Sequence, residues 1–100
     1  MKLIKLLGKR IGILDTRYEA FGIKVSVINE GLENISVSSD LTFYVNGHSV
    51  APQNFLDCDM IPPGLFGICE LNGKQLGRNN VTIVGPTNTV EAMAYCFTYY

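Results

Sequence analysis

The three cysteines are the residues of this 100-residue chain whose spacing most directly suggests chemistry. Cys58 and Cys69 lie symmetrically about Pro62-Pro63-Gly64-Leu65, and a bend at these residues would bring the two thiols face to face. Their disulfide would close a loop of about a dozen residues, worth roughly 3 kcal/mol in the chain-entropy model. A Cys69–Cys96 bond and three reduced thiols are the alternatives, because three cysteines do not make a disulfide-dense sequence. Without that bond, Cys96 is expected to be a small buried hydrophobic residue.

The acidic and imidazole side chains offer little catalytic chemistry. Asp57 and Asp59 flank Cys58 and would share one face of a strand, where two carboxylates could bind a hard cation such as Ca²⁺. The neighbouring residues supply few further oxygen ligands, so a solvated acidic turn is the favoured interpretation. The single histidine, His48, follows Asn46-Gly47 and is predicted to be an exposed turn residue. Since no acid, base and nucleophile converge in the sequence, we expect no enzyme, no metal and no cofactor.

Two asparagines and several aromatic residues point instead to surface roles. Asn34-Ile35-Ser36 and Asn80-Val81-Thr82 are N-glycosylation acceptor sequences, and we expect Asn34 and Asn80 in exposed loops. Tyr95, Tyr99 and Tyr100 belong to a C-terminal aromatic cluster with Phe97. This cluster either completes the core and edge of the last strand or presents Tyr95, Tyr99 and Tyr100 for protein–protein contact.

A carbohydrate-binding or adhesion module is the alternative function. Such a module would use Tyr18, Tyr44, Tyr95 or Tyr99 as a platform for sugar rings. The sequence contains no tryptophan, which is usually the best platform for a sugar ring, and this makes the interpretation less favoured.

Charge is unevenly distributed along the chain, although the net charge is only −1. Residues 1–24 carry six Lys or Arg and two Asp or Glu, whereas residues 25–100 carry two and seven. This balance argues against a nucleic-acid partner. Residues 1–10 form a separate basic segment whose leucines and isoleucine fall on one helical face. The segment lacks the long apolar stretch of a signal peptide, so it is an interfacial helix, an edge strand, or leftover residues that lead into the first strand.

The rest of the chain, residues 11–100, is predicted to be a single all-β domain. Apolar and polar residues alternate with a period of two, which is typical of strands that are buried on one face. The predicted strands are Ile11–Arg17, Ile23–Val27, Ile35–Ser38, Leu41–Asn46, Gly67–Leu71, Val81–Val84 and Val90–Phe97. The last of these is apolar on both faces, so we expect it at the centre of a sheet.

Turn residues separate the predicted strands. Asn46-Gly47 and Asn72-Gly73 are strong signals for two-residue hairpins, because both central positions of a type I′ turn need positive φ. Seven short strands with regularly spaced turns predict an antiparallel β-sandwich of immunoglobulin-like type.

The order of strands and turns resembles the extracellular β-sandwich domains of archaeal type IV pilin-like proteins. That group includes archaellins and the accessory proteins that anchor the archaellum. The segments that carry the resemblance are Gly22–Gly31, Leu41–Gly47, Ile61–Gly64, Asn80–Gly85 and Val90–Ala94. Together they lie within about residues 11–99, and their motifs are short.

The resemblance implies a non-enzymatic structural domain outside the cell or at the cell envelope, acting by protein–protein contact. Its partners would be an envelope or S-layer protein, the filament, or another copy of a pilin-like domain in a homo-oligomer. Members of the group carry a long apolar N-terminal helix that enters the membrane or the filament. This chain shows no such helix, so residues 1–10 are expected either to stand in its place or to be a remnant of it, with any membrane anchor in a segment that the chain does not contain.

Overall fold

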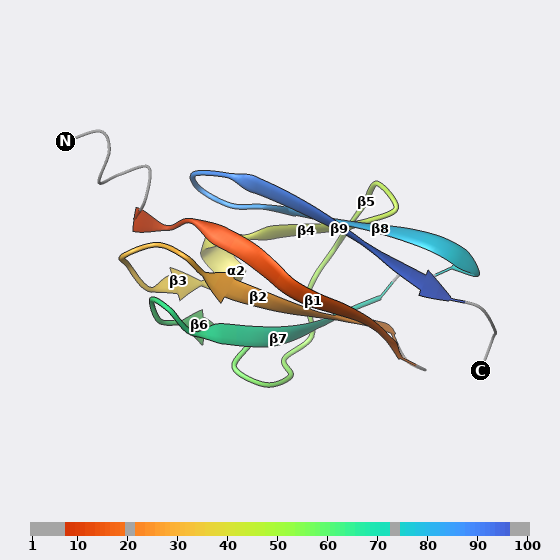
Figure 1. Cartoon of the computed structure of the whole chain (residues 1–100), viewed down its shortest axis with the longest axis horizontal. Helices are drawn as coiled ribbons and strands as arrows, with labels where there is room; N and C mark the ends of the chain where they lie inside the picture. Colours follow the sequence, from red (N-terminus) through yellow and green to blue (C-terminus); the bar gives the residue numbers. More distant parts are fainter. Residues whose placement is uncertain (1–7, 20–21, 73–74, 97–100) are drawn as a thin grey trace.

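The computed structural model describes residues 8–19, 22–72 and 75–96. In this part of the chain nine strands and one short helix follow one another (Figure 1). Their bounds are β1 (Ile11–Glu19), β2 (Gly22–Asn29), β3 (Ile35–Ser36), α2 (Val37–Asp40), β4 (Thr42–Val45), β5 (His48–Val50), β6 (Met60–Ile61), β7 (Phe66–Leu71), β8 (Gly77–Val84) and β9 (Thr89–Cys96).

The strands form two main layers. One is a three-stranded sheet in the order β1-β2-β7, and the other is a four-stranded sheet in the order β5-β4-β8-β9. Strands β3 and β6 add a small two-stranded sheet. Every pairing is antiparallel. Figure 1 shows β4, β8 and β9 of the four-stranded sheet above β1, β2 and β7 of the three-stranded sheet, with both sets of strands running roughly along the long axis. The predicted all-β, antiparallel sandwich is therefore confirmed, with two very short strands, β5 and β6, that the sequence pattern did not predict.

The core lies between the layers and follows the period-two pattern. On β2, the side chains of Ile23, Val25 and Val27 are fully buried, while Lys24 and Ser26 between them are half-buried. The four-stranded sheet contributes its own inward-facing residues. They are Phe43 and Val45 from β4 with Val81 and Ile83 from β8. Burial of large apolar side chains from both sheets provides the main driving force for folding.

The predicted strand Ile35–Ser38 is wrong in its second half. Strand β3 ends at Ser36, and Val37–Asp40 form the single turn of α2. The Asp40 carboxylate accepts a hydrogen bond from the Ser36 N–H at 2.8 Å, and the Leu41 N–H donates to the Val37 carbonyl. These local bonds compete with a strand ladder, as short polar side chains commonly do.

The predicted central position of the last strand is also wrong. β9 pairs with β8 alone and forms the edge of its sheet. Its inner face is covered, and Ala94 is buried, but Met93 and Tyr95 on the other face are 46% and 50% exposed. The sequence pattern indicated two apolar faces, and in the structure one of them is solvent-facing.

The two hairpin signals have different outcomes. Asn46 and Gly47 have φ values of 53° and 83°, and Val45 pairs with His48, so the predicted two-residue turn between β4 and β5 is confirmed. The predicted Asn72-Gly73 hairpin is wrong. Strand β7 pairs with β2, whereas β8 pairs with β4 and β9, so the chain crosses between sheets at this point. Residues 73–74 themselves lie outside the described residues.

Replacing Gly47 by alanine should lower the free energy of unfolding by about 1 kcal/mol, because Gly47 has positive φ, a region that a Cβ atom disfavours. No heavy atom lies within 4 Å of the added Cβ, so the cost comes from the backbone alone. Urea denaturation measures the change, and Gly47→Asn, which tolerates positive φ, is the matched control. Equal stability of Gly47→Ala and the unaltered protein would contradict the prediction.

The described end of the basic segment is part of the fold. The Gly8 carbonyl accepts hydrogen bonds from the Leu32 and Glu33 N–H groups, and the Lys9 ammonium forms a salt bridge of 3.1 Å with Asp40. The folded unit therefore begins before the predicted boundary at Ile11. Residues 1–7 lie outside the described residues. Within the described ranges, no helix has the length and hydrophobicity needed to span a membrane.

Candidate interaction surfaces

A disulfide joins Cys58 and Cys69, whose Cα atoms are 5.1 Å apart. Cys69 is fully buried in β7, and Cys58 lies in the connection from β5 to β6, residues 51–59. The bond therefore ties this connection to the three-stranded sheet and leaves Cys69 unavailable to Cys96. Cys96 ends β9, and its side chain lies outside the description.

The predicted acidic pair does not lie on a strand. Asp57 and Asp59 are both exposed in the 51–59 connection, and Asp57 has a φ of 55°, so the expectation of a shared strand face is wrong. No group of three or more His, Cys, Asp or Glu residues that could hold a metal ion occurs in the described ranges. His48 is exposed, as expected, and begins β5 directly after the turn.

The two glycosylation candidates occupy different environments. Asn34 is exposed in the loop before β3. Asn80 is exposed but lies inside β8, where its N–H donates to the Asn46 side chain at 2.9 Å, so its predicted loop position is wrong.

Of the predicted C-terminal aromatic surface, only Tyr95 lies within the described residues. Tyr95 is half exposed and pairs with Arg78, while Tyr44 is half-buried in β4 and pairs with Thr82. These partners are four residues apart on β8, so the two described tyrosine side chains do not form one platform. Tyr99, Tyr100 and Phe97 lie outside the described residues, as does the side chain of Tyr18.

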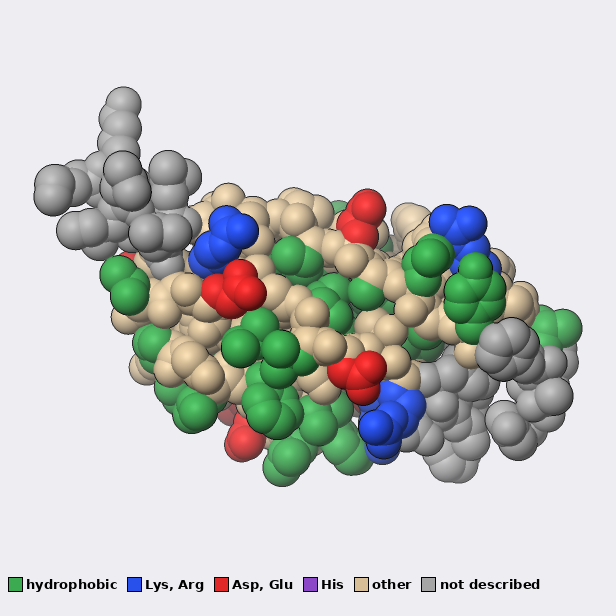
Figure 2. All heavy atoms as spheres, viewed as in Figure 1, with side chains coloured by type: hydrophobic (Ala, Val, Ile, Leu, Met, Phe, Trp, Pro, Cys, Tyr) green, Lys and Arg blue, Asp and Glu red, His purple; other side chains and the backbone are tan. Residues whose placement is uncertain are grey.

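A different apolar surface lies on the outer face of the three-stranded sheet. We call Ile28, Phe55, Phe66 and Ile68 the apolar patch. Ile28 pairs with Phe66 across β2 and β7, and Ile68 occupies the same face two residues further on. Phe55 and Phe66 are 49% and 46% exposed, and both isoleucines are half-buried. Figure 2 shows hydrophobic side chains gathered over the region where β2 and β7 run.

Charged residues border one end of the apolar patch. The Phe55 ring lies 4.0 Å from the Lys24 Nζ atom, a cation–π contact that holds the 51–59 connection against β2. Lys24 pairs with Arg17 across the sheet, and Asp15 lies 4.0 Å from the Arg17 guanidinium. Phe55, Lys24, Arg17 and Asp15 line a shallow hollow of about 240 Å³. The surface thus combines an apolar centre with a polar border, as protein interfaces do.

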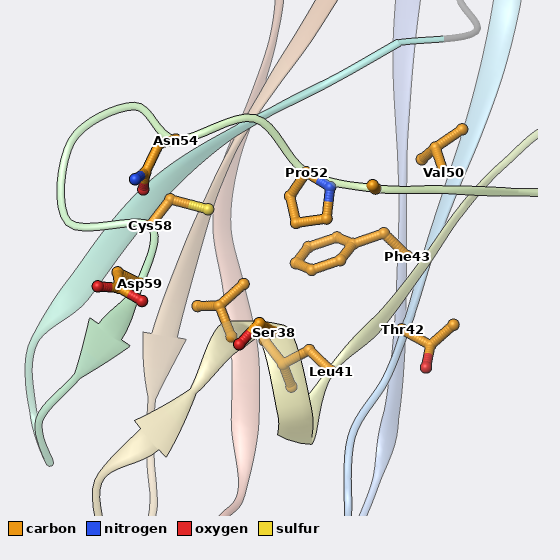
Figure 3. Close-up of a pocket in the computed structure, with 11 residues that line it drawn as sticks. Ser38, Leu41, Thr42, Phe43, Val50, Pro52, Asn54, Cys58 and Asp59 are labelled. Carbon is orange, nitrogen blue, oxygen red and sulfur yellow. The ribbon is translucent and has the colours of Figure 1, made fainter.

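A second candidate is a groove of about 430 Å³ between α2, β4 and the 51–59 connection (Figure 3). We refer to it as the groove. Its apolar lining includes Leu41, Phe43, Val50 and Pro52, and Figure 3 shows Asn54 and Asp59 at one side of it. Cys58 also lines it, so the disulfide helps to position one wall. An apolar lining with a few polar groups is typical of binding sites.

The sheet edges differ in how they are covered. The outer edge of β7 is occupied by the 51–59 connection: the Ile68 N–H donates to the Leu56 carbonyl at 2.7 Å, and Gln53 forms a bridge with Glu70. The edges of β1 and β9 lie against each other, where the Thr16 hydroxyl donates to the Met93 carbonyl at 2.9 Å. In the described part of the chain, no strand pairs with the outer edge of β5.

These features define an antiparallel β-sandwich with exposed apolar surfaces. No family model matches the sequence, and no curated protein matches it. A solved structure does share the fold. It is the archaellum periplasmic stator protein FlaG from Sulfolobus acidocaldarius, with a TM-score of 0.60, 19% sequence identity, and coverage of 86% of this chain and 99% of that chain. At this level of identity, the likeness shows a common fold.

Neither surface could be identified from the sequence. Phe66, Ile68 and Glu70 alternate with Gly67, Cys69 and Leu71, and both sets contain apolar residues. The pattern shows which residues share a face, but not which face another layer covers. The signal that the sequence offered for the apolar patch was the hydrophobicity of both faces of β7.

Proposed function

We propose that this chain is a non-enzymatic structural domain of an archaellum accessory protein or a related pilin-like protein at the outside of the cell envelope. It acts by binding other proteins of the assembly. The apolar patch is the observation that carries the proposal, and the fold shared with FlaG supports the choice of assembly.

The energetic argument concerns Phe55 and Phe66. About half of each side chain is in contact with water. Covering the exposed area would contribute on the order of 2 kcal/mol per ring, before the cost of association. The border of Arg17, Lys24 and Asp15 would set the orientation of a partner more than its affinity, because exposed charge pairs contribute little to binding energy.

Replacing Phe66 by serine is the test of this function. Purified archaellin filaments and envelope proteins from the source organism would be assayed for binding to the immobilised chain. We expect at least one of them to bind, and we expect Phe66→Ser to weaken that binding by about tenfold because it removes an interface anchor.

Met93→Ser is the matched control, since Met93 is exposed to the same extent as Phe66 but lies on the other sheet. It should leave binding unchanged. Absence of binding to every archaellum and envelope component, or binding that is indifferent to Phe66→Ser, would count against the proposal.

A further inference from the structure

We infer that the outer edge of β5 and the adjacent groove bind an extended segment of a partner protein, which adds as a strand to the four-stranded sheet. This inference rests on the proposed function and specifies the form of one partner. The segment would carry a large apolar side chain for the groove and a Lys or Arg next to it.

The first argument is the hydrogen bonding of β5. Val45 and His48 flank the two-residue turn and so form a hydrogen-bonded pair. Ser49, opposite Tyr44, is then in a non-hydrogen-bonded position, and its N–H and C=O groups point away from β4. These groups are the donors and acceptors that an added strand requires.

The second argument is that, among the described residues, no strand pairs with the outer edge of β5, and its short length is its remaining protection. The edge of β7 is covered by the 51–59 connection, and those of β1 and β9 cover each other. β5 has the sequence His48-Ser49-Val50, without lysine, proline or a bulge. Its shortness limits uncontrolled pairing, and the groove supplies the additional contact that a specific partner would need.

The third argument is continuity between the edge and the groove. Val50 ends β5 and Ala51 follows it directly, and both line the groove. A strand paired with Ser49 would therefore place alternate side chains over Phe43 and Pro52, which also line the groove. The volume of about 430 Å³ is at the small end for ligand sites, and it suits one or two side chains.

The fourth argument is charge. Asp59 lines the groove, and Asp57 is exposed two residues before it. Neither carboxylate has a salt bridge to a described residue within 4.0 Å. A Lys or Arg next to the large apolar side chain of the partner segment would complement these two carboxylates. This charge sets the expected chemistry of the segment.

A phage-displayed library of random dodecapeptides, selected on the whole chain, tests the inference. Enriched peptides should alternate apolar residues with a period of two and carry Lys or Arg. With a synthetic enriched peptide, Ser49→Pro should weaken binding by about tenfold, because proline cannot donate to the added strand. Ala51→Trp, which obstructs the groove without removing an N–H group, should give a similar loss even if Ser49→Pro folds poorly.

The remaining variants separate this inference from the proposed function. Asp59→Lys should weaken binding by about fivefold through charge reversal, and Glu91→Lys on the outer face of β9 should have no effect. Phe66→Ser should also leave peptide binding intact. Failure to enrich a period-two peptide, or binding that survives Ser49→Pro and Ala51→Trp, overturns the inference. Peptide binding lost only in Phe66→Ser would overturn it while supporting the apolar patch.

Discussion

Replacing Asn29 by alanine is expected to lower the free energy of unfolding by about 3 kcal/mol, because several buried polar groups would lose their partners together. The Asn29 side chain is fully buried. Its Nδ2 group donates to the carbonyls of Glu33 at 2.6 Å and Ile61 at 2.8 Å, and its Oδ1 atom accepts from the Gly31 N–H at 2.9 Å. One side chain thus connects the end of β2, the following loop and β6.

The measurement is chemical denaturation with two further variants. Asn29→Asp keeps the acceptor for Gly31 but removes both donors, so it should be about as damaging as alanine. Asn34→Ala, in an exposed loop, should change stability by less than about 0.5 kcal/mol. If Asn29→Ala were no more destabilising than Asn34→Ala, the proposed role of the buried amide would be wrong.

Removing the disulfide should lower the free energy of unfolding by a similar amount, about 3 kcal/mol, because the unfolded chain regains conformational entropy. The appropriate variant is the double substitution Cys58→Ala with Cys69→Ala. Part of the loss should be local, because the bond holds the 51–59 connection that covers the edge of β7 and forms one wall of the groove.

Reductant provides the control for this prediction. It should reduce the stability of the unaltered protein to that of the double variant and leave the double variant unchanged. Alkylation of the unfolded chain should label one thiol before reduction and three after it, since two of the three cysteines are bonded. Labelling of three thiols without reductant would contradict the bond.

Local features were predictable where neighbouring residues alone determine the conformation. Asn46-Gly47 forms its turn because both residues reach positive φ at low cost. The strands of the core follow the period of two, as on β2, where Ile23, Val25 and Val27 point inward. The Pro62-Pro63-Gly64 bend made a Cys58–Cys69 disulfide one of the possible pairings, but the sequence did not decide between it, a Cys69–Cys96 bond and three reduced thiols.

Features that depend on the choice of partner strand were not predictable. Asn72-Gly73 carries the same local signal as Asn46-Gly47, yet β7 pairs with β2 instead of β8. Likewise, the apolar residues Met93 and Tyr95 suggested a central strand, but β9 is at an edge. The apolar patch and the β5 edge depend on which layer lies opposite and how far it extends, and this information is distributed over the whole chain.

The side chain of Asn88 has a consequence for how the chain folds. Its amide accepts a hydrogen bond from the Ile11 N–H at 3.0 Å and donates to the Ile11 carbonyl at 2.8 Å, in the way a neighbouring strand would. The Thr87 hydroxyl donates to the Lys9 carbonyl from the same turn. The backbone hydrogen bonding at the start of the first strand is therefore completed by side chains from far along the chain. Asn88 lies 77 positions after Ile11, and Thr87 lies 78 positions after Lys9. Such distant contacts slow folding. During synthesis, the contacts between the start of β1 and the turn at Thr87 and Asn88 can form only after the C-terminal hairpin has been made.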